Sequence, residues 1–246
     1  MVFFLLFVLI LFQSGSDESV SSTNFENALS TLPEKNIKYP TEDSLILQEY
    51  FSDSSRIGKK KQNKIEISIY GNEDSSFSII KFYSLTNRKW KLRNTYRYEH
   101  YSLMDLNADL SDFNNDGLND PTYISNTAAR GANEIRRLFI YDKNADSLIS
   151  IINSEDYPNL QYNEELKCID AFMVYGGSST VFLRLKKNQL KKFAVVSLDD
   201  GLSIRKIDMN GNEKTIYSDS TKGSGYIRFS TYKTERVIKE STDPGN

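Results

Sequence analysis

The run from Asp112 to Asp120, with the sequence DFNNDGLND, is the part of the chain whose residue types and spacing could do chemistry. Asp112, Asn114 and Asp116 stand at alternate positions, so a tightly curled loop can direct three side-chain oxygens at one point. Gly117 follows where such a loop turns sharply, and glycine accepts the positive φ that sharp turns often need. The spacing therefore predicts a site for a hard metal ion.

Two further residues complete the predicted ligand set. Leu118 would supply a backbone carbonyl, and Asp120 would close the set directly or through a water molecule. Roughly five or six hard oxygens, at about 2.3–2.6 Å, are what Ca²⁺ takes. The loop contains no nitrogen or sulfur donor of the kind that zinc or copper prefers, so these metals are poor candidates. We therefore predict a calcium site with the ligands Asp112, Asn114, Asp116, Leu118 and Asp120.

An ordinary turn is the alternative, because Asp, Asn and Gly are also common in solvated turns, where their side chains bond the local backbone. The regular alternation of the acidic and amide residues favours calcium. The site departs from a helix–loop–helix calcium site, in which the twelfth position is a bidentate Glu, because that position is Tyr123. Residues 122–124 also look like a strand, so we predict a calcium loop that leads into a β-strand.

The rest of the sequence contains no motif with the residue spacing of a known catalytic site. His100 is the one His and Cys168 the one Cys, which excludes an intrachain disulfide. The apolar neighbours of Cys168 predict a buried, inert thiol. No P-loop, G-x-S-x-G or paired zinc spacing occurs, and no carboxylate pair stands out among the 33 acidic residues. We therefore predict that the protein is not an enzyme, with an uncharacterised hydrolase as the reserve reading.

The N-terminal stretch predicts export. Residues 2–12 are almost wholly apolar, and the small and polar residues 13–16 follow, as in a secretory signal. The run is shorter than the ~20 residues that span a bilayer, and a buried core helix is the alternative. We predict a signal sequence at 1–16, a flexible tether at 17–41, a β domain at 42–240 and a loose tail at 241–246. The mature chain would have no transmembrane helix and would lie in the periplasm or cell envelope, or be secreted.

The elements that position the loop are predicted to be strands. Short runs of alternating or aromatic residues follow one another from residue 64, with scarcely a helical period, and 15 Tyr and 14 Phe suit pleated sheets. Tight turns separate them, including a type I′ signal at Asn210-Gly211. Residues 42–52 fit a helix or a first strand equally. The later strands are predicted at 64–70, 77–85, 88–93, 95–103, 121–125, 135–142, 147–152, 166–174, 180–187, 191–198, 202–209, 213–218 and 226–233.

These repeated meanders without βαβ units predict an antiparallel all-β fold: a compact, β-propeller-like or barrel-like single domain. Glycine-rich or small-residue loops are predicted at Thr127–Asn133 and Tyr175–Ser179. The formal net charge is −2, with 31 basic and 33 acidic residues, so nothing in the overall charge points to nucleic acid as a partner.

A family resemblance rests on the order of these features. The aspartate loop is followed by a strand, a small-residue loop, the hairpin around Leu138–Asp142, then Asn153, Pro158-Asn159-Leu160 and the strand that ends at Tyr175-Gly176-Gly177. Over about Asp109–Lys192 this order resembles exported bacterial calcium-binding proteins with a compact β-propeller-like fold. Some members are periplasmic inhibitors, or immunity proteins, that protect a cell from secreted lysozyme-type effectors. The loop is also similar to the calcium repeats of integrin-type propellers, although it occurs once here.

The resemblance implies an exported, calcium-stabilised binding protein whose partner is another protein, with a lysozyme-type effector as the implied class. The loops Thr127–Asn133 and Tyr175–Ser179 are the candidate binding loops. The alternative is a cell-surface adhesion or glycan-binding module that uses an aromatic face. That face would consist of Trp90, Tyr96, Tyr98 and Tyr101, unless these side chains pack into the core.

Overall fold

The structure is a computed structural model that describes residues 46–72, 76–99 and 105–242. The predicted signal sequence and tether lie outside the described residues, as do His100 and Tyr101. Among the described residues, no helix has the length and apolar character needed to cross a membrane.

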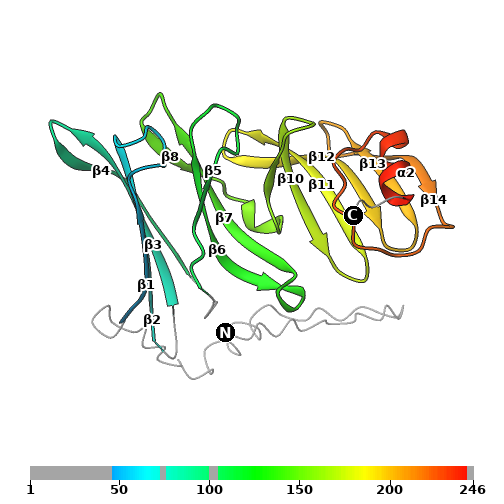
Figure 1. Cartoon of the computed structure of the whole chain (residues 1–246), viewed down its shortest axis with the longest axis horizontal. Coiled ribbons are helices and arrows are strands. Elements are labelled where there is room, and N and C mark those ends of the chain that lie inside the picture. Colours follow the sequence, from blue (N-terminus) through cyan, green and yellow to red (C-terminus); the bar gives the residue numbers. More distant parts are fainter. Residues whose placement is uncertain (1–45, 73–75, 100–104, 243–246) are drawn as a thin grey trace, which may run out of the picture. The chain divides into compact units, whose positions relative to one another are not determined.

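Three antiparallel sheets, each a meander of consecutive strands, make up the described chain (Figure 1). The first contains β1 Ile46–Asp53, β2 Asn63–Gly71, β3 Ser76–Thr86 and β4 Lys89–Glu99. The second contains β5 Asp109–Ser111, β6 Asp120–Ala128, β7 Asn133–Asp142 and β8 Ser147–Ser150. The third runs from β14 back to β9: β14 Glu213–Asp219, β13 Leu202–Ile207, β12 Gln189–Leu198, β11 Ser178–Lys186, β10 Cys168–Val174 and β9 Gln161–Asn163.

Helical structure is short. The 3₁₀ turns η2 Ala129–Gly131 and η3 Ser154–Asp156 lie within and after the second sheet, and α2 Thr234–Thr242 follows the third. The prediction of an antiparallel all-β fold is therefore confirmed. Residues 42–52 fitted a helix or a first strand equally, and the structure has a strand at Ile46–Asp53.

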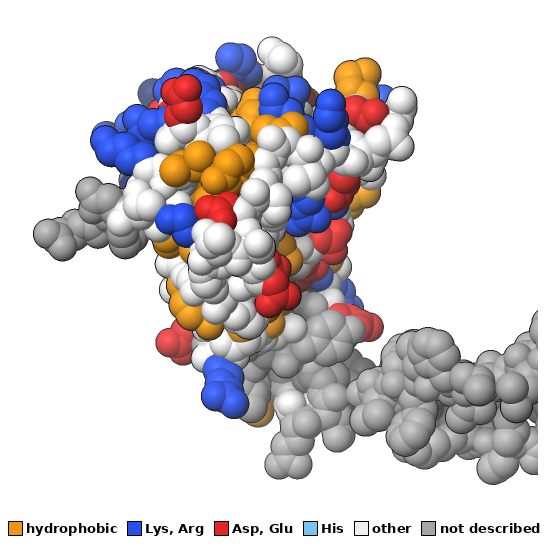
Figure 2. Space-filling view, turned by 90° about the vertical axis from the view of Figure 1, so that its right-hand side faces the viewer, with side chains coloured by type: hydrophobic (Ala, Val, Ile, Leu, Met, Phe, Trp, Pro, Cys, Tyr) orange, Lys and Arg blue, Asp and Glu red, His pale blue; other side chains and the backbone are white. Residues whose placement is uncertain are grey.

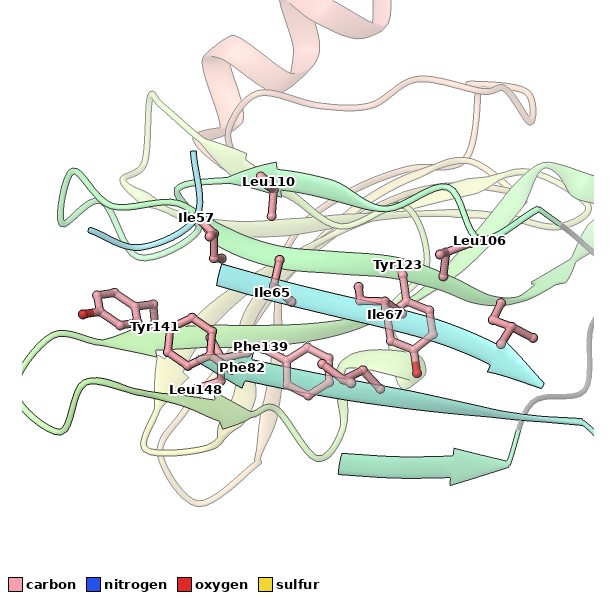
Figure 3. Close-up of a cluster of buried hydrophobic side chains, with 12 residues drawn as sticks. Ile57, Ile65, Ile67, Phe82, Leu106, Leu110, Tyr123, Phe139, Tyr141 and Leu148 are labelled. Atoms are coloured by element: carbon pink, nitrogen blue, oxygen red, sulfur yellow. The ribbon is translucent and has the colours of Figure 1, made fainter. Parts of the chain in front are cut away.

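Strand β7 shows why the sheets stack. Its run Leu138-Phe139-Ile140-Tyr141 is buried on both faces. Phe139 and Tyr141 enter a first core shared with β2 and β3 of the first sheet, drawn in Figure 3. Leu138 and Ile140 enter a second core with β10, β11 and β12 of the third sheet. Because successive side chains of a strand point to opposite faces, a continuous apolar run belongs to a sheet covered on both sides.

A third core covers the other face of the third sheet, and the C-terminal segment closes it. Phe182, Val196 and Ile204 of the sheet pack there with Phe229 and Val237, which are both fully buried. On the side where Figure 1 draws β14 and α2, Figure 2 shows acidic and basic side chains interspersed, as on a solvated surface.

The predicted last strand at 226–233 is wrong. This segment has no strand pairing and leads into α2, which also includes Ser241 and Thr242 of the predicted loose tail. Its backbone bonds to side chains, since the N–H of Ile227 donates to Ser178 Oγ at 3.2 Å and that of Phe229 to Thr180 Oγ1 at 2.9 Å. The reason is that β11 already pairs with β10 and β12, so its backbone groups are committed and only its hydroxyls are available.

Two smaller predictions also need correction. The strands predicted at 88–93 and 95–103 are one strand, β4, with a bulge between the partners of Phe82 and Tyr83. Asn210-Gly211 does not form a type I′ turn, which needs positive φ at both residues; only Gly211 has it, at 88°. The Asp208 carboxylate accepts the N–H groups of Asn210 and Asn212, at 2.8 and 2.9 Å, and holds a longer turn instead.

Candidate functional site

The predicted metal loop connects β5 to β6, and its own side-chain oxygens hold its shape. The carboxylate of Asp112 accepts the N–H of Asp116 at 3.1 Å and that of Gly117 at 2.8 Å. Asn114 Oδ1 accepts the same Asp116 N–H at 3.1 Å. Gly117 has a φ of 84°, as the sharp turn requires. The side chains at 112 and 114 therefore converge on one amide, on the inside of the loop.

Asp120 joins this loop to the sheet. Its side chain is fully buried, and its two oxygens accept the backbone N–H groups of Phe113 at 3.0 Å and Tyr141 at 2.8 Å. Burial, together with the charges of Asp116 and Asp112, raises the pKa of Asp120 to about 7, although the two backbone hydrogen bonds oppose that rise. A buried carboxylate beside two others is a position that a cation would stabilise.

Hydrophobic anchors fix the loop on both sides. Phe113 is buried in the second core, and Leu118 packs against the first. Asn119 links the loop to the β1–β2 connection, because its carbonyl accepts the Gly58 N–H and its side chain donates to the Arg56 carbonyl, each at 3.2 Å. The loop is therefore held in place by both cores and by the first sheet.

The donor set of the loop fits a hard cation in type. It offers carboxylate and amide oxygens, and Asp112, Asp116 and Asp120 form no ion pair with another described residue. Nowhere in the described chain, however, do three His, Cys, Asp or Glu side chains surround a common point as metal ligands. In the loop as it stands, these oxygens accept backbone N–H groups instead. Calcium binding therefore stays a prediction.

The chain was compared with known proteins. No family model matches it, and no curated protein matches it. Among solved structures it is similar to a Xanthomonas type IV secretion system related protein, with a TM-score of 0.43 and 11% sequence identity, over 72% of this chain and 95% of that one.

The two candidate binding loops lie side by side. Asn133, at the start of β7, donates its side-chain amide to the Val174 carbonyl at 2.9 Å and accepts the Val174 N–H at 2.9 Å. This reciprocal pair imitates a backbone ladder and joins the η2 turn to the β10–β11 turn. The predicted loop at 127–133 is shorter than expected, because β6 extends to Ala128.

Other asparagines join the second sheet to the third in the same way. Asn159 donates to the carbonyls of Ala132, at 2.9 Å, and Phe172, at 2.8 Å, and so reinforces the same two turns. Asn153 forms a reciprocal pair with Leu190, at 2.9 and 2.8 Å. Asn153 and Asn159 belong to the order of features behind the family resemblance, but nothing in that order indicates that their amides bridge two sheets.

Exposed Arg and Tyr side chains occupy the joined turns. Arg130 is exposed, within three consecutive residues of positive φ in η2. Tyr175 is 44% exposed and Tyr226 is 65% exposed. Their contact, from the Tyr226 hydroxyl to the Tyr175 carbonyl at 3.4 Å, brings the C-terminal segment to the same turns. We call Arg130, Tyr175 and Tyr226 the loop surface.

The aromatic face predicted for the alternative function is divided between the two sides of β4. Trp90 is exposed, at 39%. Tyr96 and Tyr98 pack against the first core, and their hydroxyls bond to Leu148 O at 2.6 Å and Ser150 Oγ at 2.7 Å. A glycan could therefore not contact all three side chains on one face.

A hollow beside β9 holds the buried charges of the third sheet. It is lined by Tyr162, Asn163, Asp170 and Arg228, among others. Asp170 is buried and accepts from Arg228 Nε and from Asn163 Nδ2, each at 2.8 Å. Its charge is therefore compensated by the fold, and we assign these residues to structure.

Cys168 is buried at 8% exposure, as the sequence predicts. Burial, with a smaller contribution from the nearby charge of Asp170, raises the pKa of its thiol to about 12. The thiolate form is therefore scarce near neutral pH, and Cys168 is unsuited to act as a nucleophile.

Proposed function

We propose that this chain is a binding protein whose loop surface, Arg130, Tyr175 and Tyr226, contacts another protein. The observation that carries the proposal is the reciprocal Asn133–Val174 pair, because it turns two loops that are distant in sequence into one supported surface. Loops held on a rigid sheet are where recognition usually occurs. Tyr and Arg are enriched among the residues that contribute most to protein interfaces.

The calcium loop has a structural role in this proposal. Asp112, Asn114, Asp116, Leu118 and Asp120 would hold Ca²⁺, whose charge would compensate the three carboxylates. Asp120 accepts the N–H of Tyr141 in β7, so a loop fixed by the cation would also hold β7 in place. The other end of β7 lies at the loop surface. The cation would stabilise the scaffold and would take no part in a reaction.

We also propose that the stacked meanders are blades of a propeller-like fold and that the chain is exported to the periplasm or cell envelope. Support for the first comes from the two cores that join consecutive sheets face to face. Support for the second is the apolar stretch at 2–12, followed by small and polar residues. Exported material should begin near Ser16, which N-terminal sequencing would check.

The partner class to test first is the one that the family resemblance implies, a lysozyme-type cell-wall hydrolase. The chain would inhibit it by binding and would not itself turn over a substrate. The glycan-binding alternative is less well supported, because Tyr96 and Tyr98 pack inward.

The test measures binding of the purified chain to lysozyme-type hydrolases by calorimetry, with peptidoglycan clearing as the activity readout. We expect Arg130→Ala and Tyr175→Ala each to weaken binding about tenfold or more, as is typical of central interface residues. Lys186→Ala is the control, because Lys186 is exposed at the opposite end of β11 and should leave affinity unchanged.

Equal affinity of all three variants and the parent chain would reject the loop surface as the binding site. Clearing of peptidoglycan by the purified chain alone would favour the hydrolase instead. Binding to glycan that survives Arg130→Ala and Tyr175→Ala would favour the adhesion module.

A further inference from the structure

The hairpin between β3 and β4 extends past the rest of its sheet (Figure 1). Pairing between β2 and β3 stops at Ser84, whereas β3 and β4 continue through the pairs Leu85–Trp90 and Thr86–Lys89. The turn is closed by Asn87 and Arg88, with φ values of 51° and 59°. A two-residue turn with both φ values positive matches the right-handed twist of the two strands.

The hairpin has one apolar face and several cations. Leu85, Trp90 and Leu92 lie on the same face and are 41%, 39% and 49% exposed. Lys89 and Lys91 lie on the other face, and all of Arg88, Lys89 and Lys91 are exposed. Within the described residues these three cations have no ion-pair partner.

The neighbouring β1–β2 connection adds further positive charge. Lys60 and Lys61 are exposed there, next to Gln62, whose carbonyl accepts the Leu85 N–H at 2.7 Å. Lys64 lies 5.6 Å from the Trp90 ring, but it also pairs with Glu66 at 2.7 Å and contributes little net charge. The net charge of −2 for the whole chain therefore hides a local excess of cations around the hairpin tip.

We propose that the β3–β4 hairpin docks on an anionic lipid surface, with Trp90 between Leu85 and Leu92 at the headgroup level. Its cations complement the negative lipid charge, and Trp is well suited to an interface with one apolar and one wet side. A soluble polyanion would use the cations but would leave both leucines exposed to water. Docking by this hairpin is independent of the loop surface, which belongs to other strands.

Trp90 is the single Trp of the chain, so its fluorescence reports on the hairpin even where other segments touch lipid. The full chain is titrated with vesicles of phosphatidylglycerol and phosphatidylcholine in equal parts, and with vesicles of phosphatidylcholine alone. We expect a blue shift and quenching by bromine-labelled acyl chains with the anionic vesicles only.

Variants separate charge from apolar contact. Lys89→Glu with Lys91→Glu should lower the vesicle partition coefficient at least tenfold, since each cation near an anionic surface contributes about fivefold. Leu85→Ser with Leu92→Ser should abolish the quenching by bromolipid. The control, Lys186→Glu with Lys187→Glu, reverses two charges at the exposed β11–β12 turn and should bind like the parent chain.

Three outcomes would overturn the proposal. The first is an unshifted Trp90 emission with anionic vesicles. The second is equal loss of binding in the control variant, which would mean a diffuse charge effect. The third is a change in Trp90 emission with soluble polyphosphate that equals the change with vesicles and persists in the Leu85→Ser, Leu92→Ser variant. That result would identify a site for a soluble polyanion.

Discussion

At the residue scale, Asp120 is where the predicted metal loop and the sheet meet. Its buried carboxylate accepts one N–H from the loop, at Phe113, and one from β7, at Tyr141. A sequence pattern can place an aspartate at this point, but the bond to β7 depends on residues 21 positions apart being folded together. The same holds for Asn133 and Val174, which are 41 positions apart.

Calcium should raise the melting temperature of the chain, because a ligand that binds only the folded state stabilises it. At a hundredfold excess over Kd the gain is about 2.7 kcal/mol, or roughly 5–10 °C for a domain of this size. Asp112→Ala should remove the calcium dependence. The measurement is thermal unfolding with calcium and with chelator.

Asp208→Ala is the matched control for the calcium test. Asp208 also caps a turn with its carboxylate, but in the β13–β14 connection and not in the predicted metal loop. Its removal should lower the melting temperature equally in both conditions. A parent chain that melts at one temperature with and without chelator would refute calcium binding, and so would zinc acting as well as calcium.

Asp146 gives a dependence on acid pH. Burial alone would raise the pKa of Asp146, but hydrogen bonds from Ser84, Asn63 and Tyr141 outweigh it and lower the pKa. A lowered folded-state pKa means that the stabilisation is complete above the unfolded pKa and is lost as pH falls through the folded one. Asp146→Asn, which tolerates the φ of 51°, should therefore lose less stability than the parent chain below about pH 4.

Chemical unfolding at neutral and acid pH would check this expectation. Asp200→Asn, at an exposed turn, is the control and should follow the parent chain. If Asp146→Asn lost as much stability in acid as the parent, the hydrogen-bonded carboxylate would not be the cause.

At the element scale, the β10–β11 turn is confined by the turn beside it. A Cβ on Gly177 would lie 2.3 Å from Leu198 O and 2.6 Å from Asp199 Cα, both backbone atoms. A Cβ on the adjacent Gly176 would meet nothing within 4 Å. Two neighbouring glycines in one loop therefore have different roles, and only the packing of the β12–β13 connection distinguishes them.

Gly177→Ala should destabilise the fold by about 3 kcal/mol, because the clash is with backbone that must shift. Gly176→Ala should change stability by no more than about 0.5 kcal/mol, as is usual for exposed positions. Denaturant unfolding of both variants checks the difference. Equal stability of the two would mean that the turns can separate at little cost.

At the scale of the whole molecule, the second sheet lies between two cores and couples the others. Phe139 and Ile140 are neighbours in β7, yet they belong to different cores. Loss of β7 would expose both, so we expect the described sheets to unfold in one cooperative transition.

Two natural probes can follow this transition from different sheets. Trp90 reports from the first sheet by fluorescence, and the buried Cys168 thiol reports from the third by its reactivity. Phe139→Ala should lower the free energy of unfolding by about 3–5 kcal/mol, so both probes should report a lower midpoint together. Met209→Ala, at a side chain that is 93% exposed, should move neither. A Cys168 that reacts well before Trp90 changes would show that the sheets unfold separately.

The sequence by itself determined most of the longer strands and the position of most turns between them, because alternation of side chains and turn chemistry act over a few residues. It also located the aspartate loop, since the ligand-like residues are consecutive, and it indicated the buried state of Cys168.

Only the tertiary structure decided which partners these elements take. The segment at 226–233 has the composition of a strand, but it lies beside a strand whose backbone is already paired, so it bonds to hydroxyls instead. Tyr96 and Trp90 are both aromatic residues of β4, and nothing local in the sequence shows that their side chains face opposite sides of the strand. Asn133 brings two remote turns together through one amide. The physical reason is common to all three: local propensity sets the conformation of a segment, whereas burial and hydrogen-bond satisfaction are settled by residues distant in the chain.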